Sequence, residues 1–320
     1  MSNIILLEYF TSQSFIDSDK DKEILKEALN ISDSIIKNFI DNRHVKKIFV
    51  IRNEKFKVNN LKKINILSTN SQTSYLDILK KINAKYKVLV IAPETKKLSI
   101  NFHKSIPEKF DIMSSKINIL KIFSSKIKTI NILKQHNIPS VDFYKSKTSQ
   151  KNEMIIKPDY GAGSDEIVIK KKNFINMDSN FITQKFYKGK KGSFLMLCKS
   201  GEAKVICCNE QILEYTSNKI RQIGCVMGGL ENYRDEIEVI ANRLCKNFKG
   251  LFGLIGVDIV REGKEWLIIE INSRFTSSYC GLDKSYENSI LKEITEFYVK
   301  KKIIKSGSKF IKEYKYYFYA

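Results

Sequence analysis

The chain has 320 residues, of which 42% are hydrophobic, and a formal net charge of +21. This length allows two or three domains with cores of their own, and the composition argues against a largely disordered chain. No apolar run of about 18 residues occurs, so we expect no membrane-spanning helix. The opening residues, Met1 to Phe10, lack the basic segment of a signal peptide, and we therefore expect a cytoplasmic protein.

The basic residues and the cysteines form no recognisable binding motif. Lysines are spread over the whole chain, without a zinc finger, an RNA-recognition signature or a basic arm, so no specific nucleic acid is expected as a partner. The six cysteines form no C-x-x-C pair and only three histidines are present, which argues against a zinc site. We interpret the cysteines as reduced and mostly buried, as is usual in the cytosol.

Strands alternate with helices over about the first 110 residues. Mostly apolar segments predict strands at residues 3–9, 47–51, 64–67 and 87–92. Apolar residues at helical spacing predict helices at residues 20–42 and 75–82. This order is typical of a parallel sheet covered by helices.

The remainder of the chain begins with two short helices and then becomes rich in strands. The expected helices lie at residues 116–122, from Ser124 or Ser125 to about His136, at 235–248 and at 286–300. The expected strands lie at residues 154–158, 166–169, 181–186, 193–198, 203–208, 254–261 and 266–271. The tail from Lys301 to Ala320 is basic and rich in tyrosine, and no element is predicted for it.

Acidic and amide side chains interrupt two apolar strands of the C-terminal region. Asp258 lies in the first strand, whereas Glu270 and Asn272 lie in the second, two residues apart and therefore on one face. Three oxygen ligands that converge on one face suit Mg²⁺. Arg274 follows on the same face as a candidate phosphate clamp. The alternative is a plain hairpin in which Arg274 forms an ion pair with Asp258 or Glu270.

Lys157, at the end of an expected buried strand, precedes a loop of small residues. The loop contains Gly161, Ala162, Gly163 and Ser164. Backbone N–H groups of such a loop can bind phosphates, and Lys157 would add a positive charge. The alternative is a hairpin turn beside a lysine that extends to solvent. Because the loop matches neither the P-loop nor the dinucleotide fingerprint, we exclude a Walker-type NTPase.

Several of these features, taken in chain order, resemble the ATP-grasp superfamily. They are Lys126, Lys157, the small-residue loop, the strand around Gln184, and the D…E-x-N-x-R pattern that ends at Arg274. The resemblance covers residues 114–300 and implies an α/β chain with the α+β ATP-grasp fold. It also implies a Rossmann-like parallel sheet at residues 1–113, followed by two subdomains with antiparallel sheets, at 114–187 with the phosphate loop and at 188–320 with the metal site.

The same resemblance implies a role for each candidate residue. The phosphates of ATP would be bound by Lys126, Lys157, Gly161, Ala162, Gly163 and Ser164. The adenine would be bordered by Gln184 and by the backbone of Lys185, Phe186 and Tyr187. Two ions of Mg²⁺ or Mn²⁺ would be held by Asp258, Glu270 and Asn272. Arg274 would contact the γ-phosphate or an acyl-phosphate.

Within the superfamily, the segment from Glu270 to Leu282 and the opening Leu7-Glu8-Tyr9 are similar to the archaeal tyramine–glutamate ligases of methanofuran biosynthesis. This similarity implies glutamate as the acid and tyramine as the amine. Candidate residues for the acceptor are Thr276, Ser277, Ser278 and Tyr279, with a capped loop as the alternative. Arg221 is a candidate clamp for the carboxylate. Three positions depart from the family, with Ser273 in place of the usual proline, Ser125 in place of a frequent aspartate, and Lys190 or Lys191 in place of an acidic residue for the ribose.

The resemblance predicts an ADP-forming ligase in which ATP converts a carboxylate into an acyl-phosphate that an amine then attacks. Lys157 and Arg274 would be the catalytic residues, because this reaction mainly requires positioning and charge neutralisation. The expected partners are ATP and the two small molecules, and a homodimer is compatible with the family. Three alternatives are left open: another acid and amine, a small-molecule kinase, and a non-enzymatic basic protein that binds nucleic acid.

Overall fold

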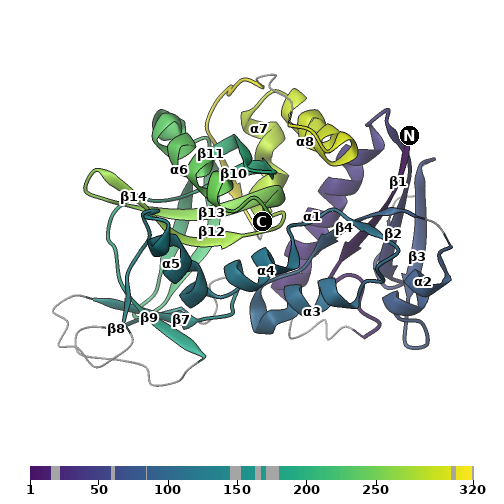
Figure 1. Ribbon diagram of the computed structural model, residues 1–320, viewed down its shortest axis with the longest axis horizontal. Helices are drawn as coiled ribbons and strands as arrows, with labels where there is room; N and C mark the ends of the chain where they lie inside the picture. The colour runs from purple at the N-terminus through teal and green to yellow at the C-terminus, as the bar shows by residue number, and fades with distance from the viewer. Residues whose placement is uncertain are drawn as a thin grey trace.

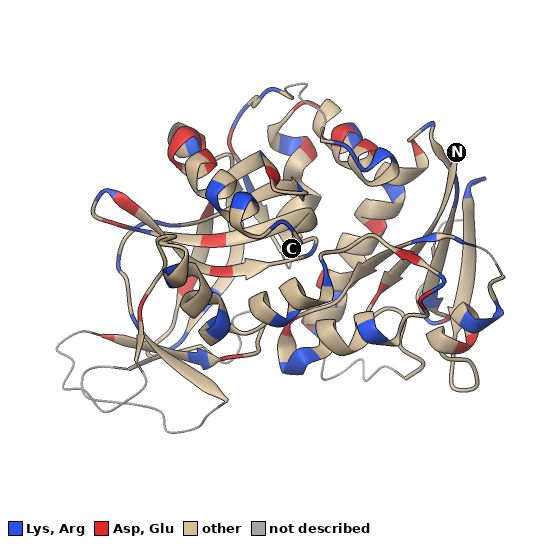
Figure 2. Cartoon of the chain, viewed as in Figure 1, with Lys and Arg blue, Asp and Glu red and all other residues tan. Residues whose placement is uncertain are grey.

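The computed structural model describes residues 1–15, 22–58, 62–83, 85–144, 153–162, 167–170, 180–303 and 308–318. Three sheets organise this part of the chain, one from the N-terminal region and two from the rest (Figure 1). Lysines and arginines are distributed over the whole described chain and are interspersed with acidic residues (Figure 2). None of the helices described is long and apolar enough to cross a membrane.

The N-terminal region forms a parallel sheet with the strand order β3-β2-β1-β4-β5. Its strands are β1 (Ser2–Glu8), β2 (Val45–Asn53), β3 (Ile64–Thr69), β4 (Lys87–Ile91) and β5 (Asp111–Ile112). Its helices are α1 (Lys22–Ile40), α2 (Tyr75–Lys81), the 3₁₀ turn η1 (Thr95–Lys97) and α3 (Leu98–Ser105). The predicted parallel sheet is confirmed, whereas α3 and β5 were not predicted.

Strand β1 is buried on both faces. Ile4 and Leu6 belong to an apolar core that also contains α1 residues such as Ile31, whereas Ile5 and Leu7 belong to a core that contains residues of α2 and α3. Helices therefore cover both sides of the sheet, as parallel sheets require. Burial on both faces explains why β1 is a continuous apolar run without alternation.

The strand order reverses at β1, which has β2 on one side and β4 on the other. Open α/β sheets bind ligands at such a point, in the crevice outside the carboxyl ends of the strands. Glu8 is the last residue of β1, and Pro93, Glu94 and Thr95 follow β4 closely. The fold therefore places these residues at an edge suited to ligand binding.

The C-terminal region contains an antiparallel sheet with the order β14-β13-β10-β11-β12-β15. Its strands are β10 (Lys191–Lys199), β11 (Glu202–Tyr215), β12 (Ile220–Met227), β13 (Phe252–Glu262), β14 (Glu265–Asn272) and β15 (Tyr314–Tyr317). Residues of α6 (Arg234–Asn247) share an apolar core with this sheet, as Leu244 does with Phe194. Neither β12 nor β15 was predicted. Strand β15 lies in the C-terminal tail, for which no element was predicted, and forms one edge of this sheet.

The third sheet is small and antiparallel, with the order β6-β9-β7-β8. Its strands are β6 (Phe143–Tyr144), β7 (Met154–Pro158), β8 (Val168–Lys170) and β9 (Phe181–Lys185), and the helices α4 (Ile117–Phe123) and α5 (Lys126–Gln135) precede them. Isolated bridges join Ser140 to Ile268 and Val168 to Lys219, which link this region to the six-stranded sheet. Ile119 and Phe123 of α4 also lie in the core that contains α6.

Short elements near the C-terminus connect the six-stranded sheet to the N-terminal region. They are η2 (Glu231–Tyr233), η3 (Ser277–Gly281), α7 (Leu282–Ser285) and α8 (Ser289–Lys300). Residues of α8, such as Ile294 and Phe297, share the apolar core of α1 and β1. The N-terminal and C-terminal regions are therefore packed against each other, and the predicted boundaries at residues 113 and 187 stay predictions.

Candidate active site

A cavity of about 190 Å³ is lined by residues of both antiparallel sheets. Lys157 of β7 lines it from the small sheet, and Asp258, Glu270 and Asn272 line it from β13 and β14. Arg274, just beyond β14, is a further lining residue. The structure therefore brings together residues that the sequence predicts to bind phosphate and metal.

The pairing of β13 with β14 explains how the oxygen-bearing side chains meet. Asp258 is the register partner of Glu270, and paired residues of adjacent antiparallel strands share a face. Asn272 is two residues beyond Glu270, and its Nδ2 donates to Oδ2 of Asp258 at 3.3 Å. Gln211 of β11 donates from Nε2 to the other Asp258 oxygen at 3.0 Å. Asp258 is thus oriented from two sides, and the role of Gln211 was not predicted.

Two lysines lie close to these carboxylates. The Nζ atom of Lys126 is 3.3 Å from Oε2 of Glu270 and donates to the backbone oxygen of Gly161 at 2.8 Å. Burial lowers the pKa of Lys157 to about 8, although Glu270 favours its charged form. Burial also disfavours the charge of Glu270, but Lys126 and Lys157 outweigh that effect and hold the pKa of Glu270 below its usual value.

The two facing carboxylates have the chemistry of a divalent cation site. Burial, followed by the charge of Glu270, raises the pKa of Asp258 well above its usual value. Such a pair cannot hold both negative charges easily unless a cation lies between them. The described ranges contain no group of three or more His, Cys, Asp or Glu residues placed to hold a metal, so a third ligand would be the amide of Asn272. This all-oxygen set fits Mg²⁺ or Mn²⁺.

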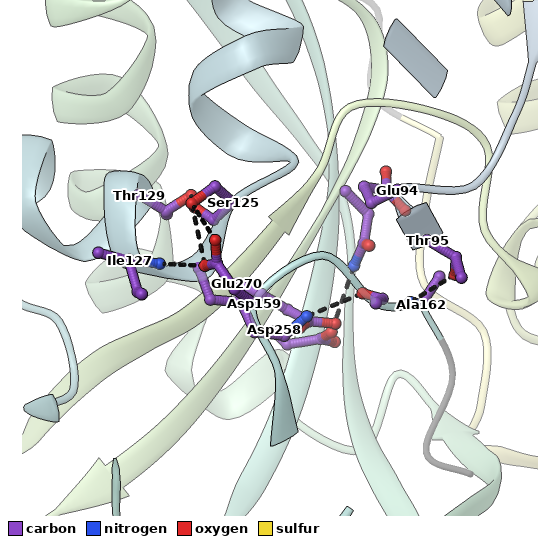
Figure 3. Close-up of polar contacts among 12 residues, drawn as sticks. Glu94, Thr95, Ser125, Ile127, Thr129, Asp159, Ala162, Asp258 and Glu270 are labelled. Carbon is purple, nitrogen blue, oxygen red and sulfur yellow. Dashed lines mark hydrogen bonds and ion pairs between the residues drawn. The ribbon is translucent and has the colours of Figure 1, made fainter. Parts of the chain in front are cut away.

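Asp159 fixes the helix that carries Lys126 (Figure 3). Its carboxylate accepts two contacts from the Ser125 hydroxyl, at 2.9 and 2.8 Å, and one from the backbone N–H of Ile127 at 2.8 Å. Ser125 is the N-cap of α5, so the carboxylate lies at the positive end of this helix. Asp159 therefore connects the end of β7, which carries Lys157, to the start of α5. Its position two residues after Lys157 was the only sequence signal for this role.

The beginning of the predicted phosphate loop is attached to the N-terminal region. The backbone N–H of Ala162 donates to Oγ1 of Thr95 at 3.0 Å (Figure 3), and the N–H of Lys96 donates to the oxygen of Tyr160 at 3.3 Å. Gly161 contributes its oxygen to Lys126, as described above. The other two predicted loop residues, Gly163 and Ser164, lie outside the described residues.

Arg274 is held by an acidic residue from the other side of the site. Oε2 of Glu94 accepts from Nε and Nη2 of Arg274 at 3.1 and 2.9 Å, and Nη1 donates to the oxygen of Phe275. Burial disfavours the charge of Arg274, but Glu94 outweighs burial and raises its pKa. Arg274 thus forms its ion pair with Glu94 and not with the carboxylates of its own hairpin. No sequence pattern indicated Glu94.

The residues predicted to border the adenine are not among the described residues that line this cavity. Gln184 is buried, and its Nε2 has no hydrogen-bond partner among the described residues. Lys185 pairs with Glu262 at 2.7 Å, and the hydroxyl of Tyr187 accepts from the backbone of Asp142. None of the side chains from Gln184 to Tyr187 is among the described lining residues of the cavity. Their contact with adenine, Phe186 included, stays a prediction.

Lys191 occupies the region where the family often has an acidic residue for the ribose. It lines the cavity, and its Nζ donates to the backbone oxygens of Tyr187 at 2.7 Å and of Gly189 at 3.3 Å. The lysine therefore fixes the segment that leads from β9 into β10.

The candidate substrate residues fall into two groups. Thr276, Ser277 and Ser278 line the cavity next to the metal residues. Tyr279 lies in the core instead, where its hydroxyl accepts from Nδ2 of Asn38 at 2.7 Å. Arg221 is not a lining residue and pairs with Glu23 of α1. The geometry therefore favours the three hydroxyl residues as substrate contacts.

Comparison with known proteins defines the class of this site. Residues 123–278, which include both lysines and both carboxylates, match the ATP-grasp domain family. An ATP-grasp superfamily protein of Archaeoglobus fulgidus has a similar structure, with a TM-score of 0.72 and 22% identity, over 92% of this chain and 88% of that chain. This region of the chain is therefore similar to ATP-grasp domains, and the whole chain has the fold of an ATP-grasp protein, as the sequence predicts.

Most of the chain is also similar to one characterised enzyme. Tyramine–L-glutamate ligase of Methanocaldococcus jannaschii is 27% identical over 288 residues, which cover 87% of this chain and 84% of that protein. L-amino acid ligase of Bacillus licheniformis has the same fold, with a TM-score of 0.59 and 13% identity, over 94% of this chain and 74% of that chain. These findings confirm the predicted fold class and the prediction of an ATP-dependent ligase.

Proposed function

We propose that this chain joins a carboxylate to an amine through an acyl-phosphate, with ATP and Mg²⁺ or Mn²⁺, and releases ADP and phosphate. The observation that carries the proposal is that Lys157, Asp258 and Glu270 line one cavity, with a second lysine, Lys126, paired with Glu270 at 3.3 Å. Positive groups for phosphates beside acidic groups for a cation are what phosphoryl transfer requires.

The binding roles follow from the charges around the cavity. Lys126 and Lys157 would hold the phosphates, and Asp258, Glu270 and Asn272 would hold the metal. The metal, when bound, supplies charge neutralisation at the phosphate oxygens. Apolar lining residues of the small sheet region, Ile155 and Ile167, offer a surface for the adenine ring. The ion pair with Lys126 and the nearby charge of Lys157 keep Glu270 ionised and ready to bind a cation.

The reaction would take place in two steps. A carboxylate oxygen of the acid attacks the γ-phosphorus of ATP, the bond to the bridging oxygen breaks, and ADP leaves. The amine nitrogen then attacks the acyl carbon, inorganic phosphate leaves, and the nitrogen loses a proton. Arg274 lines the same cavity as the carboxylate pair and can stabilise the negative charge of the transferred phosphate. Neither step requires a side-chain nucleophile.

The substrates are proposed by similarity to the Methanocaldococcus jannaschii ligase, with glutamate as the acid and tyramine as the amine. Thr276, Ser277 and Ser278 can bind one of them by hydrogen bonds, because they line the cavity beyond the metal residues. Arg221 receives no role in this proposal, since it pairs with Glu23 away from the lining.

The test is release of ADP with Mg²⁺-ATP, glutamate and a panel of amines that includes tyramine, for wild type and Glu270→Ala. We expect turnover that needs both the acid and the amine and that falls by about 10³-fold in the variant. Glu265→Ala is the matched control, because Glu265 begins the same strand but is exposed. Turnover that persists in Glu270→Ala, or that needs no amine, would contradict the proposal.

A further inference from the structure

A second cavity of about 80 Å³ lies at the carboxyl ends of β1 and β4. It is lined by Glu8 and Phe10 from the end of β1, by Pro93 and Thr95 after β4, and by one face of α1. This is the point where the strand order of the N-terminal sheet reverses. Ligands of open α/β sheets bind at such points, so the position itself favours a binding site.

The second cavity adjoins the first. Glu27 and Arg274 line both cavities, whereas Glu8 lines the second alone. Glu27 and Arg274 therefore mark the junction, whereas Glu8 belongs to the lining of the second cavity alone. A molecule in the second cavity would thus present one end to the site of acyl-phosphate formation.

The lining of the second cavity is apolar and negatively charged. Its apolar side chains are Phe10, Ile24, Ala28, Ile31, Ile91, Pro93 and Ala162. Its acidic side chains are Glu8 and Glu27, and the single cation among the described lining residues, Arg274, is already paired with Glu94. A negative lining repels a carboxylate and attracts an ammonium group.

We propose that this second cavity binds the acceptor amine, with its ammonium group at Glu27 and its carbon skeleton against the apolar wall. The inference rests on the proposed ligase function, because the amine enters that reaction at the acyl-phosphate. Glu27 lies at the junction, accepts a hydrogen bond from the hydroxyl of Ser277, and is partly exposed. It can therefore hold the nitrogen beside the reacting carboxyl group, and its carboxylate can accept the proton that the ammonium group must lose before the nitrogen attacks.

Glu8 adds a selective contact at the other end. Its two oxygens accept one backbone N–H each, from Phe10 at 3.1 Å and from Thr11 at 2.7 Å, and it is 3% exposed. Each carboxylate oxygen can accept more than one hydrogen bond, so acceptor capacity remains within an otherwise apolar wall. The cavity thus suits a primary amine with an apolar, ring-sized body and a hydroxyl donor at its far end, which are features of tyramine.

The first test changes the size of the cavity. Ala28→Leu places a larger side chain in its wall, and Asn30→Leu adds the same side chain to α1 at a position outside the lining. Direct binding of tyramine and its kcat/KM relative to methylamine would be measured for both variants and for wild type. We expect Ala28→Leu to lower tyramine binding and that ratio by about tenfold or more, and Asn30→Leu to change neither.

The outcomes separate this inference from the ligase proposal. If wild type binds tyramine and Ala28→Leu does not, the cavity assignment stands even when no ligation occurs. If ligation occurs and Ala28→Leu leaves the tyramine-to-methylamine ratio unchanged, the ligase stands and the cavity assignment is overturned. If wild type neither binds nor uses any amine of the panel, both are overturned. Thermal unfolding of each variant shows whether it is folded.

The second test concerns Glu8. Glu8→Gln keeps the shape of the side chain but replaces one acceptor oxygen by an NH₂ group, which donates hydrogen bonds. We expect the preference for tyramine over phenethylamine, which lacks the hydroxyl, to fall by about tenfold, because a site that hydrogen-bonds a hydroxyl discriminates strongly against its absence. An unchanged preference would show that Glu8 serves only the turn after β1.

Discussion

The two adjoining cavities are built in different ways. The first takes its carboxylate pair from a single hairpin, where strand pairing alone places Asp258 opposite Glu270. The second takes its residues from the ends of two parallel strands, from α1 and from Arg274, which are far apart in the sequence. The first is therefore defined by local pairing and the second by packing of the N-terminal region against the rest.

The difference also concerns charge. In the first cavity two acidic side chains are held together against their mutual repulsion, with lysines beside them. In the second, acidic side chains are separated by an apolar wall. Like charges side by side are costly without a ligand, whereas at Glu8 the cost is burial, which raises its pKa and is partly offset by hydrogen bonds from Thr11 and Phe10. The first cavity is thus built for a cation and phosphates, and the second for a largely apolar molecule.

The largest effect is expected from removing one charge of the carboxylate pair. Asp258→Asn keeps the shape of the side chain but removes a metal ligand, so ADP release should fall by about 10³-fold. In the absence of metal, the same change should raise the free energy of unfolding by about 1 kcal/mol, because relief from burying a charge beside Glu270 exceeds the loss of a hydrogen bond from Gln211 or Asn272.

Turnover and chemical denaturation in the presence of a metal chelator would test both parts of this prediction. Glu262→Gln is the control, since Glu262 ends the same strand at the surface and pairs with Lys185. A variant that loses both activity and metal-free stability would contradict the view that the pair is strained for function.

A smaller effect is expected at Asp159, which connects the two lysine-bearing elements. Asp159→Asn replaces an acceptor oxygen by a donor, so the contacts with Ser125 and Ile127 cannot all remain. We expect the free energy of unfolding to fall by about 1–2 kcal/mol. The KM for ATP should rise by about tenfold, because Lys126 loses its fixed position.

A double-mutant cycle with Ser125→Ala checks the assigned contact. Both changes remove the contacts between Ser125 and Asp159, so their combined effect on stability should be clearly smaller than the sum of the single effects. Additive effects would show that Asp159 acts on α5 through other contacts.

The sequence predicted most of the elements and the site residues whose partners are near in the chain, but β12 was missed although it pairs with the preceding strand, β11. The hairpin of β13 and β14 follows from apolar runs joined by a short turn, and the metal set follows from its spacing of two. The helix α3 was missed because it begins after Lys96 and Lys97, whose left-handed backbone (φ of 49° and 63°) no local pattern indicates. The strand β15 was missed because its pairing partner, β12, is distant in the sequence.

The unpredicted residues of the site share this dependence on distant partners. Glu94 is 180 residues from Arg274, and Thr95 is 67 residues from Ala162. Glu27 lies on α1 among ordinary polar positions of an amphipathic helix, where a solvent-exposed role is the simplest interpretation. Only the packing of the N-terminal sheet against the ATP-grasp domain gives these residues their contacts.

The smallest effect considered concerns Glu94, which links the two cavities through Arg274. Glu94→Gln removes the charge that fixes the guanidinium group, so kcat should fall by about tenfold while the KM for ATP changes little. Glu94 is thus expected to be a positioning residue that acts through Arg274. The split between kcat and KM is the measurement that distinguishes this role from a general loss of structure.

The dependence on Arg274 can be tested directly. In an Arg274→Lys background, Glu94→Gln should cause almost no further loss of kcat, because the contact that it removes no longer exists in its native form. Glu108→Gln serves as the control, since Glu108 is exposed between α3 and β5. A full additional loss in the double variant would mean that Glu94 acts on the substrate itself. The acidic residue from the N-terminal region would then belong to the reacting site and not only to its support.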